Sequence, residues 1–144
     1  KNKVSESDAK AIIEVRVPAQ VDDAAGKTEA STVLEKEDTI AIYGSNEFAA
    51  KAIINANGGF KESKLGADKI LAVGFDSGAL QQDAIRKGIF VGSVTQDPVQ
   101  IGYQAVKLAI AAAKGETVKD VDTGSKWYDA KNIDSEEIKA LLYE

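Results

Sequence analysis

The chain has 144 residues, of which 44% are hydrophobic and 28% are charged, and its formal net charge is −5. This balance is typical of one globular domain, and the interspersed lysines form no basic stripe of the kind that nucleic-acid-binding segments carry. Cysteine and histidine are both absent, which excludes thiolate and imidazole metal sites and histidine-based acid–base catalysis. Most enzyme mechanisms are thereby removed, and we expect no nucleic-acid partner.

Apolar runs rich in β-branched residues alternate with stretches of helical periodicity along the chain. The expected strands are Ala11–Val17, Thr39–Tyr43, Ile70–Phe75 and Phe90–Thr95. The expected helices are Asp22–Lys36, Glu47–Ala56, Gly78–Lys87, Pro98–Lys114 and a short one at Ser135–Tyr143. Parallel strands need crossover connections and are buried on both faces, so this alternation predicts an α/β fold with a three-layer parallel sheet and helices on both faces.

Glycines stand where three of these helices are expected to end. Gly88 and Gly115 follow the last residues of two helical patterns, and the pair Gly58–Gly59 follows a third. A residue just past a helix often adopts positive φ, which glycine tolerates best. The segment Val121–Asp129 has a different composition, and we interpret it as an edge strand.

A polar side chain follows each of three expected strands. Asn46 comes after Thr39–Tyr43, Asp76 directly follows the next strand, and Gln96 follows the one after that. Ligands of open α/β sheets bind beyond the carboxyl ends of the strands. Amide and carboxylate groups can each make two hydrogen bonds at once, which suits the neighbouring hydroxyls of a sugar.

Alternative roles exist for these polar residues. Asn46 and Asp76 stand before helices, where their side-chain oxygens could instead act as N-caps. Glutamine is a poor cap and Asp97 is available for that task, although Gln96 could be an ordinary surface residue. Neither a Gly-x-Gly-x-x-Gly motif nor a Walker motif is present, so a nucleotide site is not supported. Trp127 and Tyr128 could stack on a sugar ring, but packing against the sheet edge is favoured.

Several segments together resemble the ribose-binding branch of the type 1 periplasmic binding proteins. The three that carry most of the resemblance are Ile70–Asp76 (ILAVGFD), Asp83–Gly88 (DAIRKG) and Val91–Gly102 (VGSVTQDPVQIG). Further similar segments are Ile40–Ala49 and Pro18–Gly26, so the resemblance spans roughly residues 12–134. It implies the solute-binding component of an ABC sugar importer, which binds a monosaccharide or a similar small polyol non-covalently between two lobes.

The resemblance also implies roles for individual residues. Asn46, Asp76 and Gln96 match residues that form hydrogen bonds to the sugar hydroxyls. Val21 occupies a corner position where ribose-binding proteins place an aromatic ring against the sugar. Because valine offers less apolar surface, the resemblance implies either a ligand other than ribose or a substitute ring from Tyr43 or Trp127.

In the family two similar lobes close on the ligand, and the resemblance places this chain in the carboxy-terminal part. Residues 1–96 are then the second lobe without its first strand and helix, 97–118 contain a helix that belongs to the first lobe, and 119–144 return to the second lobe. The chain does not begin with methionine, and we expect Lys1 not to be the natural start. The helix beginning at Pro98 is expected to pack on the missing first lobe or on another copy of the chain, or to be disordered.

The implied partners are a small sugar and an ABC permease, and the resemblance implies neither a cofactor nor an enzymatic activity. The implied location is the periplasmic or extracellular face of the cell membrane, with the full-length protein anchored by a lipid and peripheral to the bilayer. One alternative is the effector-binding domain of a lactose-repressor-type transcription regulator, which shares the fold and the Gly-Phe-Asp strand end. A more distant alternative is a fragment of an α/β enzyme such as a sugar-phosphate isomerase or kinase, but the base, phosphate loop or metal cluster that it would need is not visible.

Overall fold

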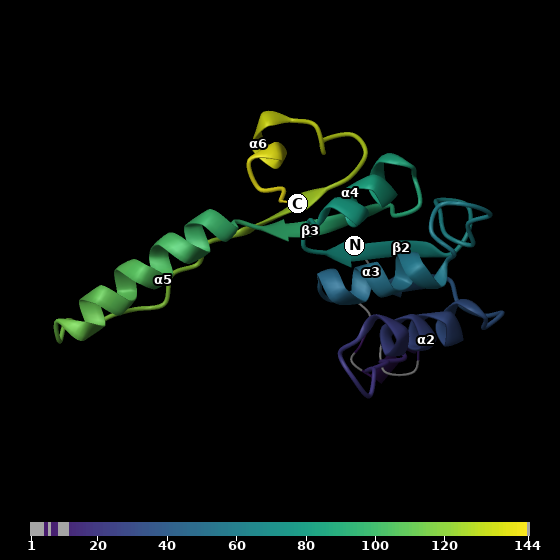
Figure 1. The fold of residues 1–144 in the computed structure, drawn as a ribbon, viewed down its shortest axis with the longest axis horizontal. Helices are drawn as coiled ribbons and strands as arrows, with labels where there is room; N and C mark the ends of the chain where they lie inside the picture. Colours follow the sequence, from purple (N-terminus) through teal and green to yellow (C-terminus); the bar gives the residue numbers. More distant parts are fainter. Residues whose placement is uncertain (1–4, 6, 9–11, 144) are drawn as a thin grey trace.

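The protein, seen as a computed structural model that describes residues 5, 7, 8 and 12–143, is built around a four-stranded sheet. Its strands lie in the order β1-β2-β3-β4, with bounds Ala41–Tyr43, Leu71–Phe75, Gly92–Gln96 and Ser125–Tyr128. The two central strands, β2 and β3, lie in the middle of the molecule in Figure 1. β1, β2 and β3 are parallel, whereas β4 runs antiparallel to β3. The α/β class and the edge strand within Val121–Asp129 are therefore confirmed.

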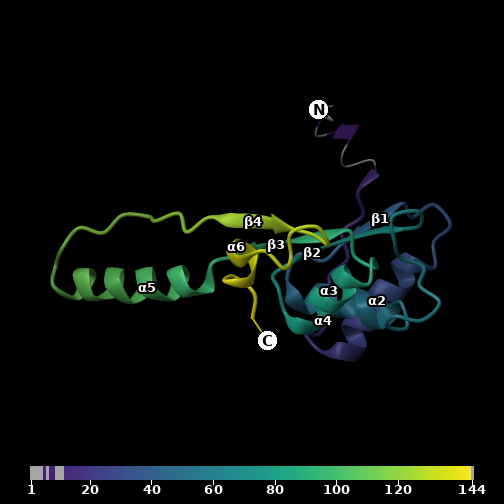
Figure 2. The ribbon, with the colours of Figure 1, turned by 90° about the horizontal axis from the view of Figure 1, so that it is seen from above.

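Three helices cover one face of the sheet and enclose the core (Figure 2). They are α2 (Asp23–Leu34), α3 (Glu47–Ala56) and α4 (Ala79–Arg86). The short α6 (Glu136–Lys139) closes the core near β4 and buries Ile138. The largest side chains that are fully buried include Tyr128, Phe90, Ile54, Ile85 and Ile133.

The opposite face of the sheet is largely open. Side chains alternate between the two faces of a strand, and the face away from the helices carries Tyr43, Leu71 and Trp127, all of them exposed. Figure 2 shows α2, α3 and α4 on one side of the sheet. Within the described residues, the helices thus supply one of the two outer layers expected from the sequence.

The strand expected at Ala11–Val17 is not formed. Ala11 lies outside the described residues, Ile12 is assigned to a helical turn, and residues 13–17 have no regular secondary structure. Val15 and Val17 are both 77% exposed. A strand is held by hydrogen bonds to a neighbouring strand, and in the described part of the chain β1 pairs only with β2, which leaves this apolar run without a partner.

The glycines mark helix ends as expected. Gly58, Gly88 and Gly115 all have positive φ, between 69° and 78°. After α5 (Pro98–Ala113), the amide of Glu116 donates to the carbonyl of Ala111 at 3.0 Å, which is the longer hydrogen bond of a Schellman-type ending. These positions allow the chain to leave each helix at once and enter the next loop.

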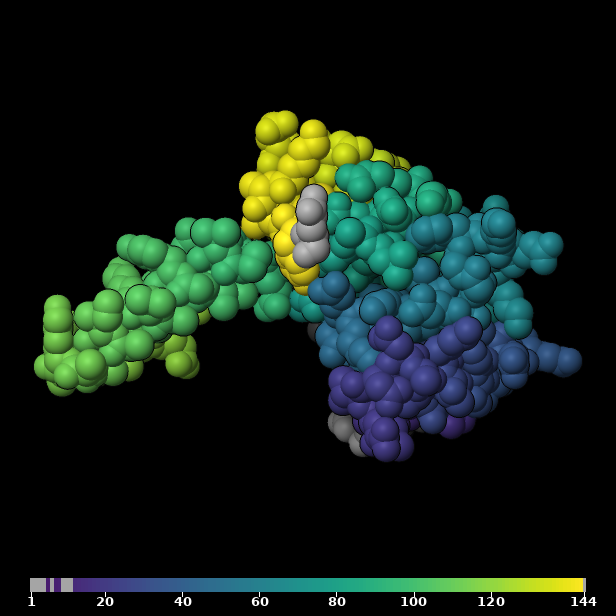
Figure 3. All heavy atoms as spheres, in the orientation of Figure 1, coloured from purple at the N-terminus to yellow at the C-terminus, as the bar shows by residue number. Residues whose placement is uncertain are grey.

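α5 projects away from the rest of the molecule as a separate arm (Figure 3). None of its residues is buried, and Val99, Tyr103, Val106 and Ile110 are all more than half exposed. Residues 114–124 then run back toward the sheet without forming a helix or strand and lead into β4 (Figure 2). The helical pattern of this segment was predicted correctly, but the described residues leave its apolar side largely exposed.

No helix in the described ranges of the chain is both long enough and apolar enough to cross a bilayer.

Candidate functional site

The three predicted hydrogen-bonding residues lie along one edge of the sheet, at the carboxyl ends of β1, β2 and β3. Asn46 comes shortly after β1, Asp76 directly follows β2, and Gln96 is the last residue of β3. Because these strands are adjacent and parallel, their ends meet at the same edge. We call Asn46, Asp76 and Gln96 the rim.

Asn46 is the N-cap of α3. Its Oδ1 accepts a hydrogen bond of 2.9 Å from the amide of Ala49, and its backbone is extended, as a capping residue requires. The two N–H groups of the same side chain have no partner in the described part of the chain, and the residue is exposed. The capping role is therefore present, and it leaves the donor end of the amide available.

Asp76 does not cap the helix that follows it. The N-cap of α4 is Gly78, which has no side-chain capping bond. Instead, Oδ2 of Asp76 accepts a hydrogen bond of 3.0 Å from the amide of Glu47, the first residue of α3. Asn46 and Asp76 thus meet at one helix N-terminus, where the helix dipole favours a carboxylate.

Gln96 is exposed at the end of β3, and the capping task falls to its neighbour as expected. Oδ1 of Asp97 accepts a hydrogen bond of 2.8 Å from the amide of Gln100 at the start of α5. Gln96 also lines a small cavity of about 120 Å³. The other residues around this cavity are Asp97, Thr123, Gly124, Ser125, Lys126 and Leu141.

The aromatic candidates differ in position. Tyr43 ends β1 on the open face, at the same edge as the rim. The ring of Trp127 lies over Gly92, because a Cβ atom built on that glycine would fall 2.2 Å from the ring. Gly92 begins β3, at the opposite end from Gln96, so Trp127 does not reach the rim. Val21 precedes the α2 cap and is 87% exposed.

Tyr128 packs inside the protein, as the favoured interpretation of the sequence had it. Its ring is fully buried, and its hydroxyl donates a hydrogen bond of 2.8 Å to the main-chain carbonyl of Asp76. Burial raises the pKa of Tyr128 to about 12. The residue is neutral at physiological pH and can therefore act as a hydrogen-bond donor.

Tyr143 and Glu47 also lie at the rim, and sequence reasoning missed them as site residues. The helix expected at Ser135–Tyr143 ends at Lys139, and the tail turns back toward α3. The hydroxyl of Tyr143 lies 3.2 Å from Oε2 of Glu47 and 3.5 Å from the amide of Ser77. Burial raises the pKa of Tyr143, and the nearby carboxylates of Asp76 and Glu47 raise it further.

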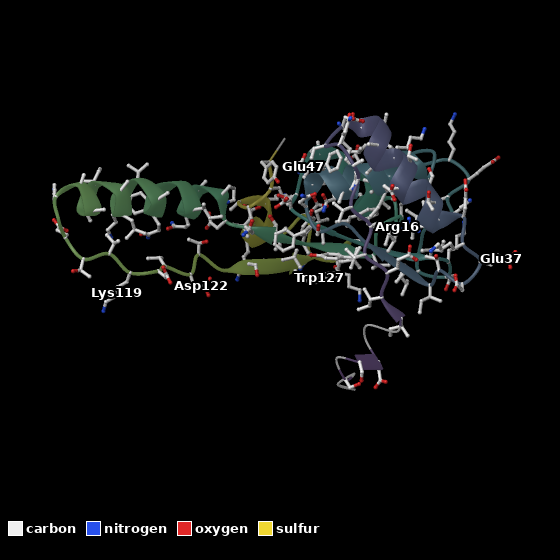
Figure 4. The ribbon with its side chains drawn as sticks, turned by 90° about the horizontal axis from the view of Figure 1, so that it is seen from below. Arg16, Glu37, Glu47, Lys119, Asp122 and Trp127 are labelled. Carbon is white, nitrogen blue, oxygen red and sulfur yellow. The ribbon has the colours of Figure 1, made fainter. Side chains whose placement is uncertain are left out.

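Glu47 and Trp127 occupy opposite sides of the sheet (Figure 4). The carboxylate of Glu47 lies against the β2–α4 turn, where a Cβ atom on Gly78 would come within 2.1 Å of its Oε1. The rim is therefore acidic on the helical side and polar and uncharged at Gln96. Among the described residues, no group of three or more carboxylate, imidazole or thiolate side chains could hold a metal ion.

Three adjacent parallel strands with amide and carboxylate groups beyond their carboxyl ends form the arrangement in which open α/β proteins bind their ligands. Residues 5–117 match a family described as a periplasmic binding protein domain. The chain belongs to this family of type 1 periplasmic sugar-binding proteins, as its sequence resemblance implied. No curated protein gives a significant match to the sequence.

Solved structures support the same assignment. A protein from Brachyspira murdochii described as "ABC transporter, LacI family transcriptional regulator" is 45% identical, with a TM-score of 0.79 over 91% of this chain and 43% of its own. An ABC transporter solute-binding protein from Agrobacterium vitis with bound D-fucose is 27% identical, with a TM-score of 0.78 over 95% and 48%. A carbohydrate transporter solute-binding protein from Agrobacterium radiobacter in complex with D-arabinose is 28% identical, with a TM-score of 0.72 over 84% and 40%. The chain thus spans less than half the length of each of these structures.

Proposed function

We propose that the chain is part of the solute-binding component of an ABC sugar importer and contributes one side of a site for a monosaccharide or a similar small polyol. The observation that carries this proposal is the convergence of Asn46, Asp76 and Gln96 at the carboxyl ends of three adjacent strands. Support comes from the family and from two neighbours whose descriptions name a bound D-fucose and D-arabinose. No chemical step and no cofactor is part of the proposal.

In the proposed mechanism the sugar is bound by hydrogen bonds from two lobes. Asp76 accepts from hydroxyls through the oxygen that is not used by Glu47, Asn46 donates through its free N–H groups, and Gln96 can do either. Val21 and Tyr43 supply apolar contacts around the ring. A ligand that contacts both lobes only when they are closed shifts a hinge equilibrium, which a membrane permease can recognise.

We propose the following division of the chain. Residues 1–96 belong to the second lobe, 97–118 carry the helix that packs on the first lobe, and 119–144 return to the second lobe. The uncovered apolar side of α5 supports this division. The full-length protein would act at the outer face of the cell membrane, held there by a lipid anchor.

A test of the site uses the chain in solution. One lobe supplies only some of the contacts, so we expect weak, millimolar binding or none by calorimetry with pentoses, hexoses and polyols. In ¹⁵N–¹H correlation spectra, the sugars that bind should shift the signals of residues 46, 76 and 96. Asp76→Ala should abolish these shifts, whereas Asp68→Ala, in an exposed loop, should leave them unchanged. Shifts confined to other surfaces would contradict the proposed site.

A second candidate is the effector-binding domain of a lactose-repressor-type regulator. The description of the Brachyspira murdochii structure, which includes the words "LacI family transcriptional regulator", favours keeping this candidate. The coding sequence upstream of the chain distinguishes the two. A secretion signal followed by a lipid-attached cysteine supports the importer component, whereas a helix-turn-helix segment supports the regulator.

A further inference from the structure

The backbone of Asp76 has a left-handed conformation, which is uncommon for residues other than glycine, although aspartate adopts it more readily than most. Its φ is +75°, in the left-handed region, and Glu62 in an exposed loop is the other described non-glycine residue with positive φ. Non-glycine residues hold this conformation only when their surroundings fix it. The main chain of Asp76 must therefore be restrained by its neighbours.

Three side chains form hydrogen bonds to the main-chain carbonyl oxygen of Asp76. The main-chain carbonyl of Asp76 accepts hydrogen bonds from Nε2 of Gln81 at 3.0 Å, from Oγ of Ser93 at 3.1 Å and from the hydroxyl of Tyr128 at 2.8 Å. These donors come from α4, β3 and β4, and all three residues are buried. The amide of Asp76 in turn donates to the carbonyl of Val94 at 2.7 Å. The peptide groups on both sides of its Cα are thus anchored.

Gln81 restrains Asp76 through its Nε2 while its own Oε1 stays without a hydrogen bond in the described part of the chain. Its Oε1 is buried and has no hydrogen-bond partner among the described residues, while its Nε2 is shared by the carbonyls of Phe75 and Asp76 and by Ser93. The side chain fits because Gly74 leaves room, since a Cβ atom there would lie 2.3 Å from Nε2. A buried acceptor without a partner reduces stability. The arrangement favours geometry at Asp76 over complete hydrogen bonding of Gln81.

We infer that Gln81, Ser93 and Tyr128 are positioning residues. They hold the main chain of Asp76 so that its carboxylate points to the start of α3, at the edge of the sheet where the rim lies. The inference depends on the proposed function for its purpose, because a carboxylate needs this placement only if it meets a ligand. The positioning itself is a property of the chain alone. It has a built-in reporter, the amide of Glu47, which donates to Oδ2 of Asp76.

The test is ¹⁵N–¹H NMR of the chain without any sugar. In the double variant Gln81→Leu, Tyr128→Phe, the signal of the Glu47 amide should move toward its position in Asp76→Ala, and its hydrogen exchange should accelerate about fivefold, as for one lost hydrogen bond. The Ala49 amide, which binds Asn46, should keep its exchange rate. The matched control is Thr95→Val, since Thr95 is a buried residue whose hydroxyl contacts Ser77 and Leu141 but not Asp76.

A Glu47 amide that is unchanged in the folded double variant, or one that moves equally in Thr95→Val, overturns the inference. If the double variant does not fold, the single variants Ser93→Ala and Tyr128→Phe each remove one hydroxyl, and the same readout at smaller amplitude decides the question. The outcome is separate from that of the proposed function. Sugar-induced shifts confined to surfaces other than the rim would remove the sugar site, whereas a displaced Glu47 amide would still establish the positioning role.

Discussion

α3 and α5 are both amphipathic, both begin at a side-chain cap and both were predicted from the same periodicity, yet only α3 is packed. α3 buries Ala50, Ala52, Ile53 and Ile54, whereas α5 buries none of its sixteen residues. Periodicity reports that a helix has an apolar side, but the surface that covers this side lies elsewhere in the chain or outside it. The sequence of a segment thus determines that it forms an amphipathic helix, whereas its surroundings determine whether that helix is packed.

Hydrogen exchange should reveal the largest difference between the two helices. In dilute solution, amides of α5 should exchange on the order of a thousandfold faster than those of α3, because an uncovered helix is marginal in water and a packed one opens only with its core. Mass spectrometry or NMR would measure this. Equal protection of α5 would mean that it is covered in solution, and sedimentation should then show concentration-dependent association of the chain.

Removing a large side chain from the core beneath the packed helices should lower the stability of the protein strongly. Phe90 is 1% exposed, and Phe90→Ala should lower the free energy of unfolding by about 3–5 kcal/mol, because the cavity adds to the lost apolar burial. Urea denaturation measures the change. The matched variant on α5, Val106→Ala, should stay within about 0.5 kcal/mol because Val106 is exposed. A comparable loss in both variants would contradict the separation of the two regions.

The difference between packed and unpacked segments also explains how far the sequence could predict the fold. Apolar runs and the glycine stops at Gly58, Gly88 and Gly115 located three strands and the ends of three helices closely. The prediction of a strand at Ala11–Val17 was wrong. A strand needs a neighbouring strand to pair with, and the β propensity of a segment does not tell whether such a neighbour is present. The three rim residues were located from the sequence because each follows an expected strand. Tyr143 could not be predicted, since no local pattern signals that the chain turns back after Lys139.

Tyr128 should make stability depend on alkaline pH. Its pKa is about 12 in the folded protein and close to 10.0 when exposed, so above pH 10 the unfolded chain loses a proton that the folded chain keeps. Stability is therefore complete below pH 10 and should fall by up to about 2 kcal/mol as pH rises toward 12. Tyr128→Phe should remove this component. Tyr103→Phe, on exposed α5, should leave it in place, and an identical pH profile in all three proteins would contradict the prediction.

Replacing glycine by alanine should have opposite effects on stability in the packed sheet and in α5. Gly74→Ala places a Cβ atom against buried Gln81 and should cost about 1–3 kcal/mol. Gly102 lies within α5, and apart from the adjoining helix backbone nothing in the described residues lies within 4 Å of an added Cβ. Gly102→Ala should stabilise that helix by about 0.5–1 kcal/mol, visible as slower amide exchange in α5 with no change in the urea midpoint. Destabilisation in both cases would show that α5 is packed after all.

The positive φ of Asp76 limits which residues that position can accept. Apart from glycine, asparagine and aspartate tolerate this backbone best, whereas longer and β-branched side chains do not. Val21, which the proposed function also places at the sugar, is exposed and has no such backbone restriction. In the proposed sugar site, the conformation of Asp76 thus restricts the acidic position to very few residue types, whereas the positions around it are free to vary.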